Sequence, residues 1–400
     1  MSEYQHYHFM VDESLTDGQL AEIRALTTRA RLTRHSFVNT YTWGDFKGDP
    51  QALLESTYDA YLYFANWGTR QVSLRWPDTA LPLDVAETYC AGAPATSRAA
   101  GGYVLISLES DSEGEAEDFI DLFDHGHDGD MGEQWLPSIT RARSHVAEGD
   151  LRLLYLAWLL RLQAGELDDN DLEPPVPPGL AELPESLTDL ATFLRIDPDL
   201  VAAAATGSPR PVPRPSLAAH RAWIATLDPG EKDAVLAQLL HGDDVQPLSG
   251  LRRRFQDTCT ATAPDPAPRT VAELRAAVSA QRARRIAHEQ QQEAEERERV
   301  VREAREAQDR RLSDLQHDPE TAWQQAGELL TVRGTRHYRE VVQLLSDLAA
   351  LADRDDTMTA FTERYGEFIT AHRTKKALLR ALRADGPACA ALIARTPATD

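Results

Sequence analysis

The strongest constraint on this chain is a long segment, residues 271–315, that contains neither glycine nor proline. It consists largely of alanine, arginine, glutamate and glutamine, all of which favour the α-helix. At 1.5 Å per residue, one helix of this length extends on the order of 68 Å. We therefore predict a long charged helix over 271–315 that separates two structured regions of different character.

The charge pattern of this segment favours a solvated helix. Glutamate precedes arginine by four residues in a series of pairs: Glu293 with Arg297, Glu295 with Arg299, Glu298 with Arg302, and Glu306 with Arg310. Each such pair stabilises an exposed helix by roughly 0.2–0.5 kcal/mol. The apolar register of Val271, Leu274 and Val278 does not continue, because its next positions hold Gln281, Arg285 and His288. A coiled coil needs sustained apolar positions. A rigid spacer is therefore favoured, and a homo-oligomer through the 271–315 helix is the alternative.

The composition limits the class of protein. The 400 residues carry a net charge of −22 and are 42% hydrophobic, which is enough for two to three domains with cores of their own. The negative charge argues against general affinity for nucleic acid or anionic membranes. No apolar run is long enough for a membrane span, and the first ten residues do not resemble a signal peptide. We expect a cytoplasmic protein whose three separated cysteines are free thiols.

Residues 1–110 have the pattern of an α/β domain. Alternating segments predict strands, and segments with helical spacing lie between them. The predicted strands are Tyr4–Val11, His35–Trp43, Thr69–Trp76 and Tyr103–Leu108, and the predicted helices follow Thr16, span Pro50–Ala65 and lie near Leu83–Cys90. This βαβαβαβ-like order predicts a sheet of about four strands covered by helices.

Aromatic residues gather in the same region, where 15 of the 28 aromatic residues of the chain lie. The simplest interpretation is a well-filled core with an aromatic rim. The alternative is a recognition surface, since tyrosine and tryptophan are favoured in binding hot spots. The candidate binding residues are Tyr41, Trp43, Asp45, Lys47, Asn66, Trp67 and Arg70.

An acidic segment follows. Residues 109–133 contain eleven aspartates and glutamates and no lysine or arginine. Such a segment predicts a flexible surface loop, over 111–134, because it buries too little apolar surface to offset its ordering entropy. Carboxylates and imidazoles within it could hold a divalent ion. The candidate ligands are Asp124, His125, His127, Asp128 and Asp130. The EF-hand template does not fit, because Gly129 at its sixth position would place Gly126 third and Trp135 twelfth.

The remainder of the chain has helical character. We predict a helical body over 135–206 with a central apolar helix at 151–163, a Pro-rich linker over 207–216, and a helical pair over 217–263. The acids between 166 and 173 are interpreted as solvated. A linker and the long helix occupy 264–318, and a helical domain occupies 319–400. Its predicted helices are Pro319–Leu330, His337–Ala352, Met358–Thr370 and Arg373–Ala384, of which the last is notably basic.

Two resemblances accompany these patterns. The segments YTWGDFKGDP, YLYFANWGTR, ELDDNDLEPPVPPGL and FLRIDPDL, within residues 41–200, resemble a group of hypothetical bacterial proteins, which implies no activity. The segments YREVVQLLSDLAAL and FTERYGEFITAHRTKKALLRAL resemble helical tails found after SWIM-type zinc fingers. The CxC and CxH zinc ligands of that finger are missing here. This resemblance therefore implies a helical interaction module without zinc.

The chain lacks the common short catalytic motifs, including GxxxxGK[ST], GxGxxG after a strand, HExxH, CxxC and GxSxG. We therefore predict a multidomain, mostly α protein that acts as a non-enzymatic cytoplasmic adaptor, with protein partners and no identifiable cofactor. One alternative is a metal-dependent enzyme or sensor that uses the 124–130 loop. Another is a nucleic-acid-associated regulator that works through the basic 373–383 helix.

Overall fold

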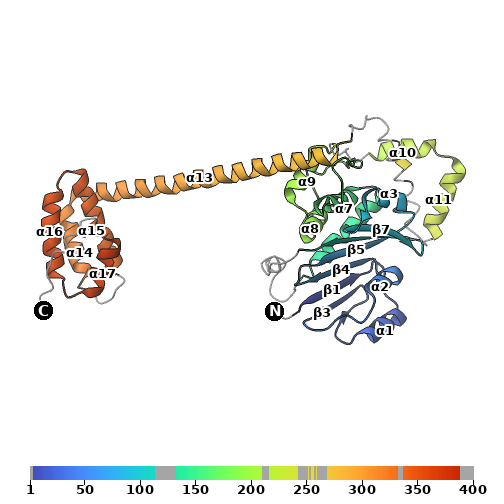
Figure 1. Cartoon of the computed structure of the whole chain (residues 1–400), viewed down its shortest axis with the longest axis horizontal. Coiled ribbons are helices and arrows are strands. Elements are labelled where there is room, and N and C mark those ends of the chain that lie inside the picture. The colour runs from blue at the N-terminus through green and yellow to red at the C-terminus, as the bar shows by residue number, and fades with distance from the viewer. Residues whose placement is uncertain are drawn as a thin grey trace. The chain divides into compact units, whose positions relative to one another are not determined.

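The computed structural model describes residues 3–112, 132–209, 216–241, 251, 254, 255, 258, 268–331 and 337–387. The chain divides into two compact units, Met1–Arg285 and Ile286–Asp400. Helices predominate, and the first unit also contains an antiparallel sheet (Figure 1). The prediction of a multidomain, mostly α protein is confirmed at this level. No helix in the described ranges is long and apolar enough to cross a membrane.

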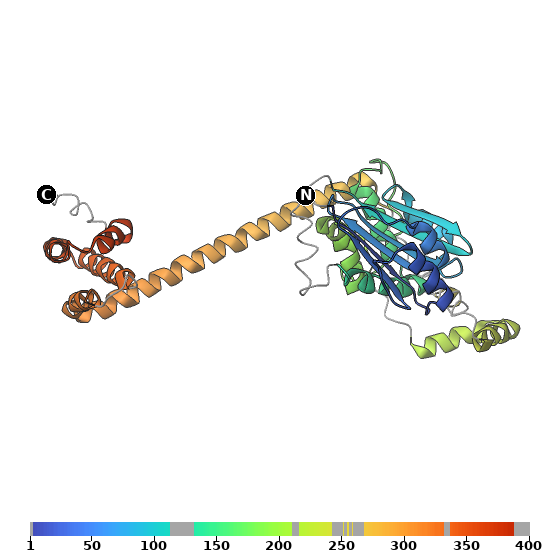
Figure 2. The same cartoon turned by 90° about the horizontal axis from the view of Figure 1, so that it is seen from below.

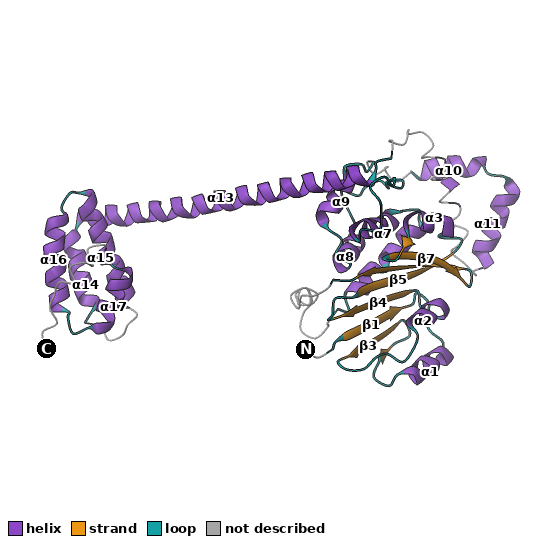
Figure 3. Ribbon diagram, in the orientation of Figure 1, coloured by secondary structure: helices purple, strands orange, loops and turns teal. Residues whose placement is uncertain are grey.

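The sheet of the first unit has eight strands in the order β2-β3-β1-β4-β5-β8-β7-β6, so the expectation of about four strands was wrong. Every neighbouring pair is antiparallel (Figure 3). The strands are β1 (Gln5–Met10), β2 (Arg31–Leu32), β3 (Ser36–Tyr41), β4 (Ala60–Ala65), β5 (Arg70–Pro77), β6 (Ala91–Gly92), β7 (Ala95–Ala100) and β8 (Tyr103–Ser110). The four predicted strands correspond to β1, β3, β5 and β8.

The predicted helix over Pro50–Ala65 is wrong in its second half. Helix α2 covers only Pro50–Ser56, with the Asp49 carboxylate accepting hydrogen bonds from the first-turn amides. Strand β4 then begins at Ala60. Leu62 and Phe64 face one side of the sheet, and Tyr61 faces the other. Because both faces of β4 are apolar or aromatic, its alternation is not visible as a polar–apolar pattern.

One face of the sheet is covered by a group of helices (Figures 1 and 2). These are α3 (Leu83–Tyr89), α5 (Trp135–Ile139), α6 (Arg141–Ala147), α7 (Arg152–Gln163), α8 (Glu185–Phe193) and α9 (Pro198–Ala205). Helix α7 is buried nearly all round, as predicted for a central helix. These helices and the apolar face of β4, β5 and β8 share one hydrophobic cluster. The segments 1–110 and 135–206 therefore have a common core rather than separate ones.

The opposite face of the sheet is covered in part by α1 (Asp17–Leu26) and α2. Aromatic side chains fill this second cluster, with Phe9 and Phe37 fully buried and their ring centroids 5.3 Å apart. The helical pair predicted after the Pro-rich linker is present as α10 (Leu217–Thr226) and α11 (Pro229–His241).

The long helix α13 covers Val271–His317, which confirms the helix predicted for 271–315. Its first residues belong to the core of the first unit, because Val271 and Leu274 are fully buried in the same hydrophobic cluster as the covering helices. Within the second unit, Leu312 is buried and Arg311 pairs with Asp347 at 2.8 Å. The helix is thus anchored by side chains near both of its ends.

The described residues of the second unit form four further helices at the predicted positions: α14 (Pro319–Leu329), α15 (His337–Arg354), α16 (Met358–Ala371) and α17 (Lys376–Asp385). Asp318 caps α14, with Pro319 at its first position. Their apolar faces form a separate core in which Leu345, Tyr365 and Leu378 are fully buried. The regular helical spacing of these residues explains why the sequence predicts these helices well.

Candidate functional site

Five of the candidate binding residues lie in two turns at one end of the sheet. The register of β1 places them together, because Gln5 pairs with Tyr41 at the end of β3 and with Ala65 at the end of β4. The turn after β3 (residues 42–48) and the turn after β4 (residues 66–69) therefore flank the start of β1. We call these two turns and the start of β1 the sheet end.

Two tryptophans are exposed at the sheet end, Trp43 by 65% and Trp67 by 49%. The Arg29 guanidinium lies 4.4 Å from the Trp43 ring centroid and supports that ring from one side. Lys47 in the same turn is also exposed. Most other aromatic side chains of this unit are buried. Two exposed tryptophans on neighbouring turns thus provide the aromatic surface that protein-binding hot spots use.

A buried glutamine holds the turn that carries Trp43. Gln5 is 3% exposed, and its Nε2 donates to Asp45 Oδ1 at 2.6 Å and to the Gly44 carbonyl oxygen at 3.3 Å. Its Oε1 accepts hydrogen bonds from the hydroxyls of Tyr7 at 2.6 Å and Tyr63 at 3.2 Å. Burial, aided by the Asp45 charge, raises the pKa of Tyr7 to about 12, so this hydroxyl remains a donor. Gln5 was not among the residues selected from the sequence, although a single amide at the start of a strand of aromatic residues and histidines was the available signal.

Three of the candidate binding residues have structural roles instead. The Tyr41 hydroxyl is buried and accepts a hydrogen bond from Asn39 Nδ2 at 2.8 Å. Arg70 is 5% exposed and donates to the Phe193 carbonyl oxygen at 3.0 Å, which links β5 to α8. Asn66 Oδ1 accepts from the Tyr4 amide at 3.0 Å. Tyr41 and Arg70 lie in the interior, so the recognition surface reduces to the exposed side chains of the two turns.

The candidate metal ligands Asp124, His125, His127, Asp128 and Asp130 lie outside the described residues. Within the described parts of the chain, no group of three or more histidine, cysteine, aspartate or glutamate side chains is arranged to hold a metal ion. The metal hypothesis therefore gains no support from the structure.

Strand β1 also carries two buried histidines, whose side chains share a face because they are two residues apart. His6 is 1% exposed and His8 is 4% exposed. The His6 ring stacks on Phe64 with 4.8 Å between centroids. Among the residues that the structure describes, neither His6 Nε2 nor His8 Nδ1 has a hydrogen-bond partner. Burial, with further repulsion by Arg31, lowers the pKa of His6 to about 3 and that of His8 to about 4.

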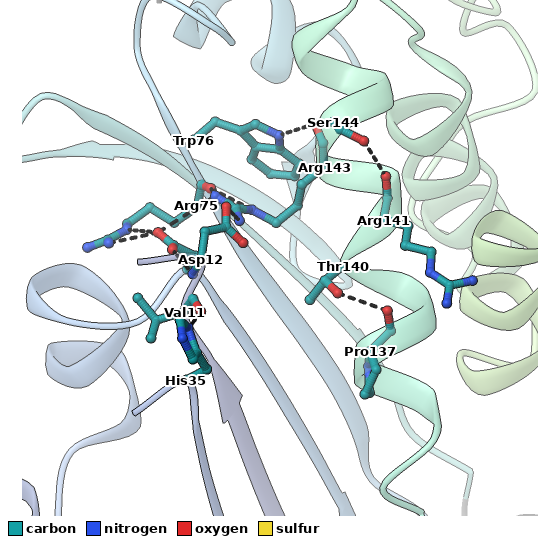
Figure 4. A network of polar contacts seen from close by, with 11 residues as sticks. Val11, Asp12, His35, Arg75, Trp76, Pro137, Thr140, Arg141, Arg143 and Ser144 are labelled. Carbon is teal, nitrogen blue, oxygen red and sulfur yellow. Dashed lines mark hydrogen bonds and ion pairs between the residues drawn. The ribbon is translucent and has the colours of Figure 1, made fainter. Parts of the chain in front are cut away.

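A polar network joins α6 to the sheet (Figure 4). Arg143 donates to the Arg75 carbonyl oxygen from Nε at 3.0 Å and from Nη2 at 2.7 Å, and its Nη1 pairs with Asp12 at 2.6 Å. Trp76 Nε1 donates to the Arg143 carbonyl oxygen at 3.0 Å, and the Arg75 side chain pairs with Asp59 at 2.8 Å. Both guanidinium groups thus have acceptors, as buried charges require. The network holds the helical layer on the sheet.

A second network fixes the start of α13. The Glu173 side chain is 1% exposed, and its two oxygens accept from Arg269 Nε and Nη2, each at 2.7 Å. Glu173 also accepts from the Tyr155 hydroxyl of α7. Arg269 donates further to carbonyl oxygens at the end of α9. The expectation that the acids of 166–173 are solvated is therefore wrong for Glu173, because an arginine far away in the sequence neutralises its buried carboxylate.

Two arginines continue this attachment along α13. Arg285 Nη2 pairs with Asp199 Oδ2 at 2.9 Å, and Arg282 pairs with Asp197 and, at 3.5 Å, with Asp199. Hydrogen bonds from Arg285 are the main cause that lowers the pKa of Asp199. The first four turns of α13 are thus bound to the start of α9 by charge pairs and to the core of the first unit by the apolar packing of Val271 and Leu274.

Comparison of the chain with protein-family models, with curated proteins and with solved structures gives no match.

Proposed function

We propose that this chain is a non-enzymatic interaction protein in which α13 connects two partner-binding units and acts as a spacer between them. One observation carries the proposal. Residues 286–306 of α13 are all exposed, whereas Leu274 near one end is buried in the core of the first unit and Leu312 near the other end is buried within the second unit. A segment that buries nothing of its own, between two anchored ends, has the properties of a connector.

The exposed part of α13 has the means to remain helical alone. Arg299 pairs with Glu296 at 2.5 Å and with Glu303 at 2.9 Å, and Arg297 pairs with Glu293 at 3.7 Å. Pairs of this kind contribute roughly 0.2–0.5 kcal/mol each to an isolated helix. Within the exposed part of α13, the large apolar residues are Ile286, Val300 and Val301. They do not make the continuous seam that a coiled coil requires, which favours a spacer over a homo-oligomer.

The spacer role predicts that cutting α13 separates two sets of partners. A protease cleavage sequence is inserted between Glu295 and Glu296 of the full chain, which is purified with its bound proteins from its native host and then cut. We expect one partner to remain with residues 1–295 and a different one to remain with 296–400, because each unit keeps its own core. Mass spectrometry of the two fractions checks this.

The control is the same inserted sequence with one residue changed so that the protease does not cut it. The uncut protein should keep both partners in one complex by light scattering. The proposal is wrong if all partners stay on one fraction after cutting, or if the uncut chain purifies without any stoichiometric partner. If the chain is a homodimer whose fragments still associate after cutting, and do so only through their parts of α13, the result would support the homo-oligomer alternative.

The sheet end predicts where the first unit binds. The double variant Trp43→Ala and Trp67→Ala should change the free energy of unfolding by under about 1 kcal/mol, because Trp43 is largely exposed and Trp67 is about half exposed. It should weaken binding of the partner retained by residues 1–295 by about thirtyfold or more, as expected for loss of a hot spot. Isothermal titration calorimetry measures the affinity. Leu172→Ala with Leu217→Ala, at side chains 60% and 66% exposed, is the matched control and should bind normally.

A further inference from the structure

We infer that the exposed face of α17 binds an extended acidic segment of a partner protein, and this inference rests on the proposed function as an interaction protein. Helix α17 buries Leu378 and Leu382 completely. Its opposite side and the preceding turn carry four exposed cations: Arg373, Lys376, Arg380 and Arg383. We call these four residues the basic ridge. Within residues 337–387, none of the four pairs with a carboxylate.

The N-terminal end of the basic ridge conflicts with local rules of helix stability, whereas Arg383 in the last turn accords with them. The N-terminus of a helix carries a partial positive charge, which favours acids there and disfavours lysine and arginine. Yet α17 begins with Lys375 and Lys376, has no acid in its first turn and has no side-chain cap. By contrast, α14 begins with an aspartate cap and a glutamate in its first turn. A charge that weakens its own helix without any compensating contact indicates a role outside folding.

The spacing of the ridge fits an extended peptide. Lys376 and Arg380 are one turn apart, which is a rise of about 6 Å along the helix axis. Alternate residues of an extended chain are about 6.6–6.8 Å apart and point to the same side. Carboxylates at alternate positions of an acidic segment can therefore meet successive cations of the ridge. Arg380 and Arg383 can also accept a carboxylate in the bidentate manner.

The charge of the whole protein favours a short acidic peptide over nucleic acid. The chain has 64 acids against 42 lysines and arginines. A nucleic acid is a long polyanion whose charges extend beyond the ridge, over a unit (residues 286–400) that itself has 21 acids against 17 lysines and arginines. A short peptide keeps its charges close to the ridge. At physiological ionic strength, exposed charges attract one another strongly only within about one Debye length, roughly 8 Å, so the ridge cations act mainly on such nearby carboxylates. The ridge is therefore assigned to an acidic polypeptide.

The test measures fluorescence anisotropy of a short labelled peptide of alternating glutamate and serine, titrated with the full chain. We expect salt-dependent binding that weakens at least about tenfold in the triple variant K376E/R380E/R383E. Circular dichroism of the single variant Lys376→Glu should show unchanged or higher thermal stability, because it places an acid at the helix N-terminus. Loss of binding together with retained stability distinguishes a binding role from a structural one.

The matched control R302E/R305E/R339E makes the same change in net charge at exposed arginines elsewhere in the second unit. It should bind the peptide about as well as the unchanged chain. The inference is overturned if the unchanged chain does not bind the peptide, if the triple ridge variant binds it equally well, or if duplex DNA binds more tightly through the ridge. These outcomes are independent of the cleavage experiment on α13, so failure here leaves the spacer proposal to its own test.

Discussion

Replacing Glu173 by glutamine should lower the free energy of unfolding of the first unit by about 3–5 kcal/mol. The change removes the buried carboxylate but leaves the Arg269 guanidinium facing a neutral amide and the carbonyl end of α9. Removing one partner of a buried ion pair has costs of this size, and the Arg269 side chain that would be left without its partner is only 23% exposed. For a unit of this size, the loss corresponds to a fall in the melting temperature on the order of 10 °C.

Urea and thermal unfolding of the full chain, followed by a probe in the first unit, measure the effect. Hydrogen exchange should also accelerate in residues 271–285, since the start of α13 loses an anchor. The matched control is Asp169→Asn, which removes an ion pair to Arg275 whose side chains are 66% and 42% exposed. Exposed pairs contribute at most about 1 kcal/mol. Equal losses in the two variants would contradict the assignment of Glu173 as the main polar anchor.

The second large effect is a loss of stability as the pH falls from 7 to 5. His6 and His8 have pKa values near 3 and near 4 in the folded protein, with burial as the main cause. In the unfolded chain a histidine titrates near 6.5, so the unfolded state takes up protons in this range and the folded state does not. Stability is therefore full above about pH 6.5 and falls below it. At pH 5 the loss amounts to about 2 kcal/mol per histidine.

Urea unfolding at several pH values between 5 and 7.5 measures this slope. In the variant His6→Phe, whose ring can retain the stack on Phe64, the slope should fall to about half, because one of the two buried groups no longer titrates. The exposed His35 supplies the control, and His35→Asn should keep the full slope. A free energy of unfolding that is constant from pH 7.5 to 5 would contradict this, because it would show that the two histidines take up protons in the folded state as readily as in the unfolded chain.

Local signals predicted most of the helices, although the helix predicted over Pro50–Ala65 is a strand in its second half. The C-terminal helices begin and end within a few residues of their predicted positions, and Asp-Pro pairs mark four helix starts: Asp49 before α2, Asp197 before α9, Asp228 before α11 and Asp318 before α14. Such signals are local, because a cap and its helix lie within a few residues of each other. The strands were harder. Strand β7, with the sequence ATSRAA, has small side chains and no alternation, and only its pairing with β8 makes it a strand.

The same distinction holds for the candidate site. The two aromatic turns could be selected from their residue types, but the sequence did not show that Arg70 is buried under α8 or that Gln5 supports the turn of Trp43. The Glu173–Arg269 pair joins residues 96 positions apart, and no spacing rule indicates such a pair. Contacts of this range depend on how the sheet and helices pack.

By itself the sequence determined the long helix, the C-terminal helical unit and the basic face of α17, because helix formation, capping and charge periodicity depend on neighbours within one or two turns. Only the tertiary structure decided the number of strands, the common core of the sheet and its helices, and which candidate residues are exposed. Strand pairing and burial depend on partners distant in the sequence, which the register of β1 between β3 and β4 brings together.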